Sequence, residues 1–177
     1  DYKEMKDGYD KLFEEMLAEV VATYDKSRPY WPSSPKNGWG RAASLTEGDV
    51  HYWGVWWGEL PYEMYLEKVG RFNSDFGYQS YPSMATLKMI DDNLDFDNGV
   101  IQTHHKHNRG EKLIMDHVVK YYGEPKDFED YVYLSQLSQV FGMDIAISAQ
   151  RGSRPRSMGS LYWQLNDAWT SISWSSI

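Results

Sequence analysis

The sequence predicts an α/β fold in which short strands alternate with helices around a parallel sheet. Two observations support this: runs rich in β-branched and aromatic residues alternate with stretches of helical period, and polar candidate residues follow the predicted strands directly. A (β/α)8 barrel keeps its functional residues at the carboxyl ends of its strands, and a complete barrel takes about 250 residues and eight strands. With 177 residues and four predicted strands, the chain corresponds to about half of a barrel.

The first half of the chain is predicted to begin with a helix over residues 9–21. Its apolar side chains recur at i, i+3 and i+4, which places them on one face. Pro29 then directs the chain into extended structure. We expect a strand at 30–33, a loop rich in Pro, Gly and Ser, and a second strand at 50–55. A helix beginning near Pro61 follows, because proline is favoured in the first turn of a helix.

The second half is predicted to contain a strand at 72–76, a helix at 83–90, a polar loop at 91–110, a helix at 111–122, a long helix ending near Gly152 and a fourth strand at 158–165. Asp127 supplies a side-chain acceptor before the long helix, and Asp130 stands three residues later. This spacing is close to that of a capping box, which marks a helix N-terminus.

Composition narrows the class of ligand. The 8 Trp and 14 Tyr residues combine apolar rings with polar groups, which suits them to partly wet clefts such as those that bind sugars. The net charge of −8 argues against nucleic acid, since phosphate binding needs a basic surface. The absence of Cys excludes disulfides, thiolate zinc sites and a cysteine nucleophile. A neutral substrate fits best.

No apolar run approaches the ~20 residues of a membrane span, and the polar N-terminus does not resemble a signal peptide. We therefore expect a soluble protein with no membrane partner. Its compartment stays open among the lysosome, the periplasm, the extracellular space and the cytoplasm.

The segment from Arg71 to Pro82 contains the strongest candidate for a catalytic residue. It reads Arg-Phe-Asn-Ser-Asp-Phe-Gly-Tyr-Gln-Ser-Tyr-Pro, so it delivers one carboxylate, Asp75, at a strand end and turns at Gly77. A strand-end carboxylate among aromatic residues suits the nucleophile of a glycoside hydrolase. The alternative is a solvated or helix-capping acid, because Asp beside Gly is also common in turns.

Four segments together resemble the catalytic barrel of glycoside hydrolase family 2, specifically its β-mannosidases: residues 27–38, 48–56, 70–82 and 158–169. The resemblance spans nearly the whole chain. It implies a partial TIM barrel, made of strands five to eight with their helices. Residues 1–177 are then the C-terminal half of a catalytic domain in a larger multidomain protein. The family's acid/base Glu and its N-terminal domains would precede Asp1.

The resemblance places Asp75 at the nucleophile position, where family members carry Glu. Removing one methylene withdraws the attacking oxygen, and ~1 Å of misplacement can cost on the order of 10²-fold in rate. Three explanations stay open: a deliberately weakened nucleophile, a natural variant with a compensating backbone shift, and lost catalysis.

Three tryptophans are candidate sugar contacts. By the resemblance, Trp163 forms part of the wall that binds the non-reducing sugar; Trp53 lies on the second strand and Trp57 just beyond it. The alternative for each is packing inside or against the barrel. His51 alternates with Trp53 and so points to the same side. It either orients a carboxylate, binds a sugar hydroxyl or is a satisfied interior histidine.

Asn166 and Asp167 follow the fourth strand and either meet substrate hydroxyls or hold the final loop. The run from His104 to His107 contains three histidines, but they cannot easily face one ion and retaining glycosidases need no metal. We expect neither a metal nor another cofactor. The resemblance places this run beside the mouth of the active site, where His104 or His105 is a candidate sugar contact; the alternative is a solvated loop.

Two classes of function follow. One is part of a retaining exo-β-mannosidase acting on oligosaccharides with terminal β-mannose. The other is a catalytically weakened, carbohydrate-binding barrel; β-galactosidase, β-glucuronidase and exo-glucosaminidase are further specificities of the family. Half a barrel exposes two sheet edges and apolar interior layers. We therefore expect the isolated chain to be poorly folded, oligomeric or paired with a complementary N-terminal half.

Overall fold

The computed structural model describes residues 1–177, and its hydrophobic core lies entirely in the part of the chain after residue 49. Nineteen buried apolar residues from Val50 to Ile172 form one cluster, in which aromatic side chains such as Trp56, Tyr62 and Tyr78 are the largest members. None of the first 49 residues is a buried member of the cluster, although the partly buried Leu45 packs against it.

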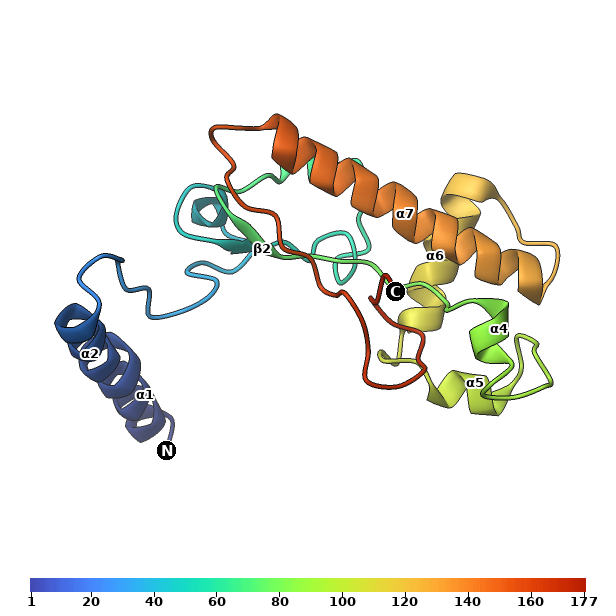
Figure 1. The fold of residues 1–177 in the computed structure, drawn as a ribbon, viewed down its shortest axis with the longest axis horizontal. Helices are drawn as coiled ribbons and strands as arrows, with labels where there is room; N and C mark the ends of the chain where they lie inside the picture. Colours follow the sequence, from blue (N-terminus) through green and yellow to red (C-terminus); the bar gives the residue numbers. More distant parts are fainter.

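The N-terminal helical segment stands apart from this core (Figure 1). It comprises α1 (Tyr2–Asp10), a π-helical turn (Lys11–Met16) and α2 (Leu17–Tyr24). Asp1 caps it by accepting from the backbone N–H groups of Lys3 and Glu4. The helix predicted at 9–21 is therefore present and longer than expected, because the cap starts it at residue 2.

The sheet is much smaller than predicted. It contains two parallel strands, β1 (Val50–His51) and β2 (Asn73–Asp75), joined through the short helix α3 (Met64–Glu67). The strands expected at 30–33 and 158–165 do not form. The stretch at 158–165 still lies along β2, since Leu161 N–H donates to the Asn73 carbonyl oxygen and Trp163 N–H to that of Phe76, each at 2.8 Å.

The lack of further neighbours explains these short strands. An interior strand of a parallel sheet pairs along both edges, whereas β1 has a partner only in β2. The prediction of four strands was therefore wrong for this chain on its own, although the order of the extended segments was correct.

Four helices follow β2: α4 (Met84–Leu87), α5 (Gly99–Thr103), α6 (Gly110–Tyr122) and α7 (Phe128–Gly152). Asp127 caps α7 by accepting from Asp130 N–H, as the sequence predicts. The segment predicted to be a polar loop at 91–110 contains α5, whose cap is Asn98. None of the helices is long and apolar enough to cross a membrane.

The long helix α7 lies along the extended segments and fixes them (Figure 1). Its Gln139 side chain donates to the carbonyl oxygens of Tyr78, Trp174 and Ser175, at 2.7, 3.4 and 3.3 Å. One side chain thereby joins the segment after β2 to the C-terminal tail. The candidate site at the end of β2 is held by this arrangement.

Candidate active site

The two parallel strands place a histidine beside the candidate nucleophile. His51 ends β1, Asp75 ends β2, and the strand register pairs the two residues. His51 Nδ1 lies 3.5 Å from Asp75 Oδ2, and both side chains are 25% exposed, so solvent reaches the pair.

Trp53 provides a second contact to the same carboxylate. Its indole Nε1–H donates to Asp75 Oδ2 at 2.9 Å. Residues 51 and 53 were predicted to point to the same side because they alternate along a strand. The structure brings both to the oxygen Oδ2, and every hydrogen bond and ion pair of the Asp75 side chain involves this oxygen.

Two further tryptophan rings pack against Trp53. The Trp53 ring lies 6.3 Å from that of Trp57 and 6.1 Å from that of Trp174, measured between centroids. His107 packs edge-on to Trp57 at 4.4 Å. Trp174 was not predicted, because it stands in a terminal Ser-Ile-Ser-Trp-Ser-Ser-Ile run without helical or strand periodicity.

Trp163 approaches the site through its backbone. A Cβ atom on Gly77 would lie 2.0 Å from the Trp163 carbonyl oxygen, so only glycine permits this close approach. The Trp163 side chain is half exposed. The Trp163 backbone therefore packs against Gly77, which follows Asp75 by two residues in the sequence.

Behind His51 lies a second carboxylate that sequence reasoning missed. Asp49 Oδ2 lies 3.5 Å from His51 Nε2 and accepts hydrogen bonds from Ser34 Oγ at 2.5 Å and Ser74 Oγ at 2.6 Å. Partial burial on its own raises the pKa of Asp49, but the two hydroxyl hydrogen bonds and the nearby His51 outweigh burial and leave the pKa lowered. Asp49 is therefore ionised at neutral pH.

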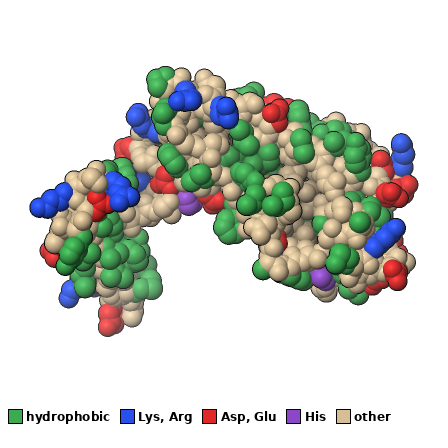
Figure 2. All heavy atoms as spheres, in the orientation of Figure 1, with side chains coloured by type: hydrophobic (Ala, Val, Ile, Leu, Met, Phe, Trp, Pro, Cys, Tyr) green, Lys and Arg blue, Asp and Glu red, His purple; other side chains and the backbone are tan.

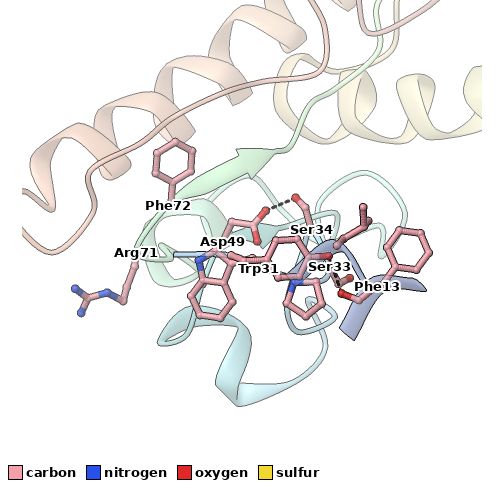
Figure 3. Close-up of a pocket in the computed structure, with 11 residues that line it drawn as sticks. Phe13, Trp31, Ser33, Ser34, Asp49, Arg71 and Phe72 are labelled. Carbon is pink, nitrogen blue, oxygen red and sulfur yellow. Dashed lines mark hydrogen bonds between the residues drawn. The ribbon is translucent and has the colours of Figure 1, made fainter. Parts of the chain in front are cut away.

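A cavity of about 720 Å³ opens on the Asp49 side of this network, between the N-terminal helix and the loop after it (Figure 3). Phe13, Leu17 and Trp31 form its apolar wall, and neither His51 nor Asp75 lines it. Because its helix wall contributes nothing to the core, we interpret this cavity as incomplete packing and not as the substrate pocket.

Two predicted residues, Asn166 and His105, form no hydrogen bond or ion pair with Asp75. Asn166 is exposed. The His105 side chain is only 5% exposed, and its Nε2 atom lies 3.2 Å from both Tyr81 Oη and Glu111 Oε2. Of its neighbours, His104 faces the Thr170 carbonyl oxygen at 2.7 Å. The histidines of this run thus contact different groups.

Asp167 holds the final loop. It accepts from Ser171 Oγ at 3.0 Å and Ser175 Oγ at 2.8 Å, and it pairs with Lys106 at 3.2 Å. Burial alone raises its pKa, but the serine hydroxyls and Lys106 together lower the pKa to about 2. Asp167 was predicted either to contact substrate hydroxyls or to hold the final loop, and this geometry supports the second role.

The comparisons with known proteins agree on one family. No protein-family model matches the chain. It is 34% identical over 171 residues to β-mannosidase B of Aspergillus terreus and, equally, of Aspergillus clavatus; each match covers 93% of this chain and 20% of the relative.

The structure is similar to the crystal structure of β-D-mannosidase from Dictyoglomus thermophilum. The TM-score is 0.86 at 33% sequence identity, covering 95% of this chain and 21% of that one. The chain thus spans about a fifth of the length of the relatives that it matches. In sequence and in structure, this chain is a homologue of one segment of the β-mannosidases.

Proposed function

We propose that the chain is the C-terminal half of the catalytic barrel of a retaining exo-β-mannosidase, which releases terminal β-D-mannose from oligosaccharides. The observation that carries this proposal is the position of Asp75 at the end of a parallel strand, held by Trp53 and faced by His51. Homology to β-mannosidases over nearly the whole chain supports the substrate class.

The geometry suits a nucleophile. Trp53 and His51 both face Oδ2 of Asp75, so Oδ1 is left for attack on the anomeric carbon. Attack forms a covalent mannosyl-enzyme as the leaving oxygen takes a proton from a second carboxyl group about 5–5.5 Å away. That group then deprotonates a water molecule, which displaces mannose from Asp75. We assign it to a Glu outside these 177 residues.

The exposed tryptophans are the sugar platform in this proposal. Trp57 and Trp163 are 40% and 50% exposed, and Trp57 packs near Trp53 beside the carboxylate. Sugar C–H faces stack on such rings. Asn166 is accessible for a hydroxyl contact, whereas burial of His105 removes it from the set of substrate contacts.

The complementary partner is the N-terminal half of the barrel. The N-terminal helix shows a broad apolar surface in Figure 2. Its residues Tyr9, Leu12, Met16 and Val20 are all exposed, and the parallel pair β1–β2 has no further strand beside it. We propose that strands of the missing half pair with this sheet and cover this face.

A non-catalytic, carbohydrate-binding barrel is the second candidate. The observation that favours it is Asp75 itself, which is one methylene shorter than the Glu expected from the resemblance. The same aromatic site then binds sugar without turnover.

Covalent trapping separates the two candidates. The chain is built into the Dictyoglomus thermophilum enzyme in place of the homologous segment, and the product is treated with a 2-fluoro mannoside. Mass spectrometry is expected to find the adduct on Asp75. Asp75→Ala should abolish it, and Asp92→Ala, at an exposed acid outside the site, should leave it unchanged.

The parental enzyme serves as the labelling control, and a cooperative melt shows that each protein is folded. A folded hybrid that binds mannose but stays unlabelled would support the second candidate. A folded hybrid that does neither would contradict both.

A further inference from the structure

Three separate stretches of the chain meet at Asp49. Ser34 comes from the loop after the N-terminal helix, Ser74 from the middle of β2, and Asp49 directly precedes β1. A carboxylate that accepts two serine hydroxyls is fixed in orientation, since charged hydrogen bonds are short and strong. It lies on the far side of His51 from Asp75.

The directions of the serine hydroxyl hydrogen bonds bear on which ring nitrogen of His51 carries the proton. A serine hydroxyl has one proton to donate, and an ionised carboxylate can only accept. Ser34 therefore donates its hydroxyl proton to Asp49. Its oxygen can then act only as an acceptor toward His51 Nε2, 3.2 Å away. This arrangement favours the ring proton on Nε2, because an unprotonated Nε2 would set two acceptor atoms against each other.

The opposite nitrogen then faces the candidate nucleophile. With Nε2 directed at Ser34 and Asp49, the ring directs Nδ1 at Asp75 Oδ2, 3.5 Å away. When the ring takes up a second proton, Nδ1–H points at the same oxygen that Trp53 holds. A substitution of Asp49 would therefore affect Asp75 through the orientation of the His51 ring, although the two carboxylates are not in direct contact.

We infer that Asp49 is a positioning residue that, with Ser34, fixes the tautomer and orientation of His51 against Asp75. The effect of this orientation on catalysis rests on the proposed function, whereas the state of His51 can be measured without it. Asp49 touches neither reacting atoms nor substrate; it acts through the imidazole, as carboxylates that orient histidines do elsewhere.

The test is ¹⁵N NMR of the full 177-residue chain labelled at histidine, with His51→Gln used to assign the resonance. At a pH where the ring is neutral, wild type should show a protonated Nε2 and an unprotonated Nδ1. Asp49→Asn should lose this signature and give the tautomer mixture of a free ring. Ser34→Ala, which leaves Asp49 and its Ser74 bond in place, should shift the signals in the same direction.

Two further variants separate this role from a general loss of structure. Asp25→Asn removes another carboxylate that accepts a serine hydroxyl, at the end of α2, and should leave His51 unchanged. Asp75→Asn should move Nδ1 and spare Nε2. An Nδ1-protonated ring in wild type, or identical His51 signals in wild type and in both Asp49→Asn and Ser34→Ala, would overturn the inference. Failure of Asp75 to be trapped, with these His51 shifts intact, would count against the proposed function alone.

Discussion

Met16 and Val20 lie on the uncovered face of the N-terminal helix, and replacing both with serine should weaken association of the chain. They are 51% and 50% exposed, so about half of each side chain is available for burial by a partner. Full burial of such a side chain is worth roughly 1.5–3 kcal/mol. Half of this for two residues is roughly 1.5–3 kcal/mol in total, or on the order of 10- to 150-fold in dissociation constant.

Sedimentation velocity over a concentration series measures this constant for the isolated chain. The matched control is Lys11→Ser with Glu15→Ser, which alters two exposed residues on the other side of the same helix without changing the net charge. The control should associate as wild type does. A wild-type chain that is a monodisperse monomer and unfolds cooperatively would refute the reasoning, as would equal effects of the two double variants.

Two other variants test the contacts that shape the site. Gly77→Ala places a Cβ 2.0 Å from the Trp163 carbonyl oxygen, so we expect a cost of about 1–3 kcal/mol and roughly 5- to 150-fold faster hydrogen exchange of the Trp163 amide. Gly99→Ala, which meets nothing within 4 Å, should leave that exchange unchanged. The pKa of Asp167 is lowered to about 2, so its ionised form stabilises the fold above about pH 4, and this contribution is lost as the pH falls toward 2. Asp167→Asn should therefore flatten the acid transition followed by near-UV circular dichroism, and an unaltered transition would exclude this role.

Local signals predicted the helices well. Asp127 marks the start of α7 because a side-chain acceptor before a periodic run satisfies free N–H groups, and that cap is present. The helix α5 was missed because its five residues carry too little periodicity to distinguish it from a loop. The strands were overestimated because a parallel strand depends on neighbours that the local sequence cannot supply.

The part of the candidate site that follows from local sequence pattern was predictable, and the part that depends on contacts between distant segments was not. His51 and Trp53 were identified by alternation along one strand, and the structure brings both to Asp75. Asp49 and Ser34 are 15 residues apart and share no pattern, so only the folded chain shows that they meet.

The most direct test of the central claim is the rate at which residue 75 is labelled by a 2-fluoro mannoside in the hybrid enzyme, with Asp75 compared to Asp75→Glu. If Asp75 stands at the nucleophile position, the adduct forms on residue 75 in both proteins. The longer side chain should react on the order of 10²-fold faster, because it restores the reach of the attacking oxygen. Folded proteins in which neither side chain is labelled would contradict the account.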